Sequence, residues 1–79
     1  MPEIKWDIKK MLGVIGDSSG GWKKEANVVS WNDRPAKIDI RPWDAEHKKM
    51  GKGITLSREE ALALKELLNN TNFDELEIS

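Results

Sequence analysis

The chain has 79 residues, a formal net charge of −1 and no cysteine. This length predicts a single domain over residues 1–79, with a core at about 4–69 and an acidic tail at 70–79. The cysteine count excludes disulfides and thiolate metal sites, and no apolar run has the length of a membrane span. With no basic-then-apolar leader either, a cytoplasmic protein is expected. A chain this short buries little core, so a second copy is expected to complete it.

Charge is unevenly distributed along the sequence. Residues 1–58 hold 12 Lys and Arg against 8 Asp and Glu, whereas residues 59–79 hold 1 against 6. All four tryptophans lie in the basic part. A basic body rich in tryptophan is compatible with nucleic-acid binding even though the whole chain is slightly acidic.

The first expected element is a strand over Ile4–Ile15. Apolar residues recur there at every second position, as in a strand with one buried face. Lys10 interrupts the apolar side, which indicates a bulge or a frayed end. The polar and glycine-rich run at residues 17–21 then predicts a loop.

Two more strands are expected, at Trp22–Trp31 and Ala36–Trp43. Between them, the Asn, Asp and Pro of residues 32–35 favour a turn. In the later strand Ile38 and Ile40 share one face, while the charged residues and Trp43 share the other. Pro42 cannot donate to a ladder, so the strand ends there or lies at an edge.

A polar loop at residues 44–49 leads to a short strand at Lys52–Leu56, entered through two glycines that predict a tight turn or a close backbone approach. Ser57 and Glu60 then have the spacing of a capping box, which predicts a helix from Arg58 to about Leu68. Residues 71–79 are compatible with a short helix, a docked strand or a frayed end. The fold class is α+β: a four-stranded curved antiparallel sheet followed by one helix, β-β-β-β-α.

The apolar stripe of the helix is too broad for one partner. Its leucines and Ala61 cover roughly 220°, whereas packing on one sheet face needs little more than about 100°. A second copy of the same helix is the simplest cover and predicts a homodimer packed through the helices. The alternative is that the acidic tail covers the excess.

Cations and aromatic residues gather on the polar side of the sheet. Bases stack on tryptophan and phosphates pair with Lys and Arg, so this mixture is suited to single-stranded nucleic acid. Arg41 has the donors to grip a phosphate with two hydrogen bonds or to stack on a base. The candidate binding residues are Trp31, Arg34, Lys37, Arg41, Trp43, Lys48, Lys49 and Lys52.

The four tryptophans do not all invite the same interpretation. Trp6 lies on the apolar parity and is expected in the core, whereas Trp22 is undecided. Trp43 shares parity with charged residues, so an exposed ligand-binding role is favoured. Trp31 is similar, although its register is open. Pairs of adjacent lysines are most simply solvated surface.

Nothing in the sequence indicates catalysis. The single histidine, His47, lies in a charged loop and is expected to be a solvated surface residue. There is no Ser/His/Asp set, no cluster of metal ligands and no phosphate-binding loop. The expectation is a protein that is not an enzyme and that uses no cofactor, metal or small-molecule substrate.

Several of these residues carry a resemblance to a known family. The run Ile38-Asp39-Ile40-Arg41, then Trp43, then residues 51–57 and a leucine-rich helix resemble the eukaryotic transcriptional coactivator positive cofactor four. The match is closer to its bacterial relatives of the YdbC type and covers roughly residues 20–69. It implies a β-β-β-β-α homodimer, joined through its helices, that binds single-stranded DNA with little sequence preference in a bacterial, nucleoid-associated setting.

The resemblance also implies roles for particular positions. An aromatic residue at the end of the second strand aligns with Trp31, and a basic residue in the following turn aligns with Arg34. Arg41, Trp43 and Lys52 align with further binding residues.

The leading hypothesis is therefore single-stranded DNA binding in transcription regulation or DNA maintenance. One alternative is a protein-interaction adaptor of the transcription machinery. The other is single-stranded RNA binding, because stacking and phosphate contacts do not depend on the 2′-hydroxyl.

Overall fold

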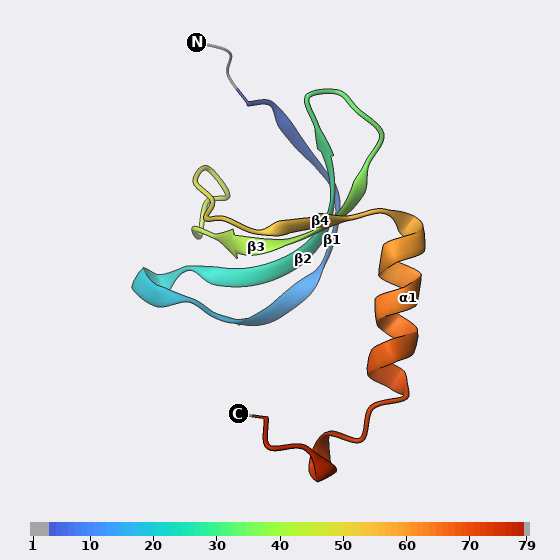
Figure 1. The fold of residues 1–79 in the computed structure, drawn as a ribbon. Coiled ribbons are helices and arrows are strands. Elements are labelled where there is room, and N and C mark those ends of the chain that lie inside the picture. Colours follow the sequence, from blue (N-terminus) through green and yellow to red (C-terminus); the bar gives the residue numbers. More distant parts are fainter. Residues whose placement is uncertain (1–3, 79) are drawn as a thin grey trace.

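The computed structural model describes residues 4–78 and has one antiparallel sheet with a helix after it (Figure 1). The strand order is β1-β2-β3-β4, so β1 and β4 are the edges. The elements are β1 (Trp6–Asp17), η1 (Ser19–Gly21), β2 (Lys23–Trp31), β3 (Lys37–Trp43), β4 (Ile54–Leu56), α1 (Arg58–Asn69) and η2 (Phe73–Glu75), where η marks a 3-10 turn. The expected α+β fold and its β-β-β-β-α order are confirmed, although β4 is shorter than expected.

The turn between β2 and β3 has the backbone that its residue types predict. Asn32 and Asp33 have φ of 51° and 62°, in the left-handed region that Asn and Asp tolerate best among non-glycine residues. The N–H of Arg34 donates to the carbonyl of Trp31 at 2.9 Å and closes the turn. Lys5 is tied to the same turn, because its N–H donates to the Asn32 Oδ1 at 3.0 Å.

Strand β1 departs from simple alternation at three places. Its register against β2 shifts between Ile8 and Lys10, between Met11 and Gly13, and between Val14 and Gly16. A bulge near Lys10 is therefore confirmed, and two more follow it. Each bulge adds a residue without a partner and increases the local twist and bend of the strand.

The register divides the sheet into two faces. Residues directly opposite each other in antiparallel strands point to the same side, and Trp6, Trp31 and Trp43 fall on one side, here called the tryptophan face. Val28, Ile38 and Ile40 fall on the other, here called the helix face. The expected separation of Ile38 and Ile40 from the charged residues of β3 is thus confirmed.

The sheet curls strongly toward the tryptophan face. Trp6 and Trp43 come from diagonally opposite ends of β1 and β3, yet their ring centroids lie 5.9 Å apart. Only a curved sheet brings such distant positions together. The curl buries Val29 and Trp43 together with the polar residues Glu25, Asn27 and Asp39.

Helix α1 begins at the predicted capping box. The Ser57 hydroxyl accepts from the Glu60 N–H, and the Glu60 carboxylate accepts from the Ser57 N–H at 2.8 Å. The helix leaves a groove of about 540 Å³ against the helix face, lined in part by Val28, Ile38 and Leu62. Its leucines stay largely exposed, from 36% at Leu64 to 66% at Leu67.

The chain enters β4 by crossing close over β3. A Cβ atom at Gly53 would lie 2.2 Å from the carbonyl oxygen of Ile40 and 2.3 Å from the Cβ of Arg41. A Cβ at Gly51 would lie 2.7 Å from the Cγ of Pro42. The close backbone approach proposed for these glycines is confirmed.

Candidate nucleic-acid interface

Half of the candidate binding residues line one open pocket of about 380 Å³ at the β2–β3 turn. They are Trp31, Arg34, Lys37 and Arg41. The pocket also includes Ile4, Asn32, Pro35, Met50 and Thr55, and none of its lining residues is acidic. An aromatic ring and three cations therefore share a hollow without a carboxylate, which favours an anionic ligand with a flat group.

Arg41 supports Trp31 within this pocket. The Arg41 guanidinium carbon lies 4.5 Å from the centroid of the Trp31 ring, in cation–π geometry. Its Nε and Nη2 donate to the two oxygens of Asp39 at 2.6 and 2.7 Å, a bidentate pair in which Asp39 is fully buried. Because Asp39 already occupies this fork, Arg41 is not free to grip a phosphate with the same two donors.

Arg34 and Lys37 supply the less constrained positive charges. Arg34 follows the turn, and its carbonyl accepts a hydrogen bond from the Ser30 hydroxyl at 2.6 Å, which anchors its backbone. Lys37 begins β3 and is paired in register with Val29. Both residues are exposed, so their charges are accessible at the pocket mouth.

The expectation that Trp43 is exposed is wrong. Its side chain has no solvent exposure and packs between Trp6 and His47, with ring centroids 5.9 and 5.6 Å away. Sharing a face with charged residues did not imply exposure, because this face is the concave one. Trp6, expected in the core, is half-buried against Trp43.

The remaining cations lie outside the pocket. Lys48 and Lys49 are exposed in the loop between β3 and β4, and Lys52 is exposed between the two glycines that lead into β4. The structure thus separates the candidate residues into the pocket group, the buried Trp43 and three surface lysines.

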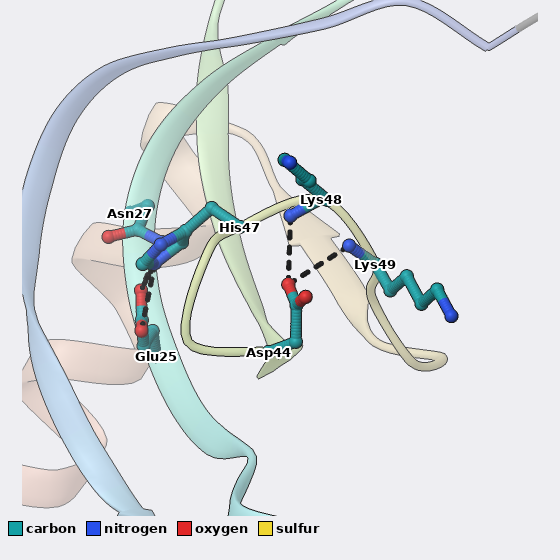
Figure 2. A network of polar contacts seen from close by, with 6 residues as sticks. All are labelled: Glu25, Asn27, Asp44, His47, Lys48 and Lys49. Atoms are coloured by element: carbon teal, nitrogen blue, oxygen red, sulfur yellow. Dashed lines mark hydrogen bonds and ion pairs between the residues drawn. The ribbon is translucent and has the colours of Figure 1, made fainter.

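The expectation of a solvated His47 is also wrong. Its Nε2 lies 2.8 and 3.0 Å from the two carboxylate oxygens of Glu25, and its side chain is only 25% exposed (Figure 2). In the same loop the N–H groups of Lys49 and Lys48 bond to Asp44 and lower the pKa of its carboxyl. Sequence reasoning could not pair His47 with a residue 22 positions away, since no local spacing encodes that contact.

Sequence reasoning also missed Asp39 and Met50. Asp39 occurs in the Ile-Asp-Ile-Arg run, and its i, i+2 spacing to Arg41 puts both residues on one strand face, which is a usable sign of pairing. Met50 reaches the pocket through a bridge to Trp43, and its sulfur lies 3.6 Å from Arg41 Nη1.

Residues 4–78 contain neither a cluster of metal ligands nor a helix that could cross a membrane. No three His, Asp or Glu side chains in this range gather as ligands for a metal ion. Neither in length nor in apolar character does any helix in this range suit a membrane crossing.

Comparison with known proteins agrees with this geometry. Residues 18–67 match the model of the family described as Transcriptional Coactivator p15 (PC4). An uncharacterized protein of Treponema pallidum (strain Nichols) is 42% identical over 72 residues, which span 91% of this chain and 85% of that protein. The family match runs from the start of the β1–β2 connection to the last turns of α1 and includes all the candidate binding residues. The chain therefore belongs to the transcriptional coactivator p15 (PC4) family, a family of nucleic-acid-binding proteins.

Proposed function

We propose that this protein binds single-stranded DNA with little sequence preference, as a homodimer and without catalysis. The observation that carries the proposal is the pocket in which Trp31 lies beside Arg34, Lys37 and Arg41 with no acidic residue in the lining. A base would stack on the Trp31 ring, and a phosphate would lie between the exposed cations.

The contacts of Arg41 support different roles for the cations of this pocket. Arg41 is held by Asp39 and lies over the Trp31 ring, so it stabilises the platform on which the base stacks. Arg34 and Lys37 then make the phosphate contacts. Stacking does not discriminate strongly among bases, which supports binding with little sequence preference.

Dimerisation is supported by what the single chain leaves uncovered. Among residues 4–78, Val29 and Trp43 are the only apolar side chains classed as buried. Helix α1 exposes its leucines at the same time. A second α1 packed on the first would cover this surface and place two pockets in one molecule, related by a twofold axis.

The test is fluorescence anisotropy with a labelled oligothymidine of about 20 nucleotides, longer than a single binding site, titrated at several salt concentrations. Wild-type protein should bind it more tightly than a duplex of equal length, and Trp31→Ala should weaken binding by about 1–3 kcal/mol. Lys37→Ala should lower the slope of log K against log salt by about 0.7. Lys24→Ala is the matched control, because Lys24 is exposed on the helix face.

The alternatives predict different results in the same assay. Oligouridine bound more tightly than oligothymidine would favour an RNA ligand. Absence of salt-dependent binding to either strand would exclude the proposed function and favour an adaptor of the transcription machinery.

A further inference from the structure

Residues 44–50 belong to the loop between β3 and β4, and they fold back over the tryptophan face to contact β2, which does not adjoin this loop in sequence. Its His47 reaches Glu25 of β2, with Nε2 2.8 and 3.0 Å from the two carboxylate oxygens. The His47 ring also lies 5.6 Å from that of Trp43, with the planes inclined by 36°. The middle of the loop is therefore fixed to the sheet.

This contact satisfies a carboxylate that the sheet buries. Glu25 is only 7% exposed, and a buried carboxylate needs hydrogen-bond donors. Asn27 Nδ2 donates to Glu25 Oε1 at 3.1 Å, and His47 is the other partner (Figure 2). Arg41 stands directly opposite Glu25 in the register, but its guanidinium bonds to Asp39 instead. Among residues 4–78, His47 is thus the only Lys, Arg or His side chain that pairs with Glu25.

Hydrogen bonds within the loop hold the backbone around His47 as well. His47 has a φ of 57°, a left-handed conformation that a residue with a Cβ adopts at a cost. Asp44 accepts from the N–H groups of Lys48 and Lys49 at 2.8 and 3.0 Å through Oδ1. Contacts on both sides of His47 therefore hold the turn in one shape.

The two residues after His47 are Lys48 and Lys49, whose ammonium groups are free to meet solvent. Figure 2 shows His47 directed toward Glu25, while both lysine side chains extend from other parts of the loop. Lys48 has only an exposed partner, Glu46, at 3.3 Å, and such surface pairs are weak. The anchoring of His47 therefore fixes the positions of the two neighbouring lysines, Lys48 and Lys49.

We propose that His47 is a positioning residue for a second contact with nucleic acid. By binding Glu25 and packing on Trp43, it holds Lys48 and Lys49 as a preformed site for the phosphodiester backbone, separate from the Trp31 pocket. This inference rests on the proposed single-strand binding and extends it. His47 does not itself contact the nucleic acid, but it orders Lys48 and Lys49, which do.

The experiment is a coupling measurement on the full chain with the same labelled oligothymidine. Lys48→Ala/Lys49→Ala should lower the salt slope by about 1.4, the value for two phosphates of a single strand. His47→Ala alone should lower it by a similar amount, and the two lysine substitutions should then have little further effect in the His47→Ala protein. Near-complete non-additivity is the expected result.

Two further variants separate positioning from folding. His47→Asn keeps a residue that tolerates positive φ but is too short to bridge to Glu25, so it should behave as His47→Ala does. Glu25→Gln removes the charge of the partner with little change in shape and should reduce the contribution of the lysines. Circular dichroism and unfolding midpoints establish whether each variant is folded. If His47→Ala is unfolded, Glu25→Gln replaces it in the coupling measurement.

The outcomes distinguish this inference from the proposed function. If the lysines contribute equally with and without His47, or contribute nothing to the salt slope, the positioning role is wrong while the Trp31 pocket can still bind DNA. If wild-type protein binds no single strand, both proposals are overturned.

Discussion

The tryptophan face and helix α1 differ in how much of their surface is buried within a single chain. The tryptophan face buries Glu25, Asn27 and Asp39, and each of these side chains has at least one hydrogen-bond partner from the same chain. Helix α1 has no buried residue and presents leucines to solvent. A single chain covers much of the tryptophan face, whereas the leucines of α1 stay uncovered. The difference teaches that packing within one chain and the proposed contact between two chains depend on separate surfaces.

A substitution in α1 is expected to have the largest effect, because it changes the surface proposed for the homodimer. Leu67→Asp should destabilise the proposed homodimer by about 3–6 kcal/mol, because each of two equivalent leucines would contribute about 1.5–3 kcal/mol on burial. Sedimentation equilibrium measures the change, with Glu59→Gln as a control on an exposed residue of the first helical turn. A Leu67→Asp protein that remains dimeric at the wild-type concentration would place the interface elsewhere.

The next largest effect is expected on the tryptophan face. Trp43→Ala should lower the free energy of unfolding by about 3–5 kcal/mol, since it empties a fully buried site. Urea unfolding measures this loss, and Trp22→Ala, which changes a half-exposed tryptophan outside the strands, should cost much less. Equal costs would mean that Trp43 is not the centre of the core. Trp43→Phe keeps an aromatic ring and should recover part of the stability.

The smallest expected effect is a dependence of the free energy of unfolding on pH. Two carboxyls contribute to it, one in α1 and one in the loop over the tryptophan face. The Ser57 N–H lowers the pKa of Glu60 in α1, and the Lys49 N–H lowers that of Asp44 in the loop. A carboxyl whose pKa is lowered by folding stabilises the protein above its unfolded pKa, and this stabilisation is lost as pH falls through the folded value. Stability should therefore decrease below about pH 4.5, the ordinary pKa of a glutamate.

Urea midpoints between pH 7 and pH 3 would measure this decrease. Glu60→Gln and Asp44→Asn should each flatten the profile, and they should do so additively because the two carboxyls belong to different regions. An unchanged profile in either variant would show that ionisation of that carboxyl adds nothing to the pH dependence of stability.

The sequence was most informative where the signal is local. Alternation located β3, the Asn-Asp turn located the hairpin, and Ser57 with Glu60 located the start of α1. Each of these depends on residues a few positions apart. The pocket residues Trp31, Arg34, Lys37 and Arg41 were also identified, because neighbouring strands bring residues of one parity to one face.

What the sequence could not give is the curvature of the sheet. Parity assigns Trp43 to the polar face, but whether that face is open or concave depends on contacts between distant strands. The same curvature explains the position of His47, which meets Glu25 only because the loop folds over a hollow surface. Residues that are buried by tertiary shape rather than by local pattern were therefore assigned incorrectly.

The three bulges of β1 have a consequence for how the protein behaves in a crowded solution. A long edge strand with exposed apolar residues, such as Leu12 and Ile15, would ordinarily attract the edge of another sheet. A partner strand needs a continuous row of evenly spaced N–H and C=O groups, and the register shifts interrupt that row in three places. The bulges that bend the sheet thus also disfavour aggregation through β1. This strand can therefore keep apolar side chains at an open edge.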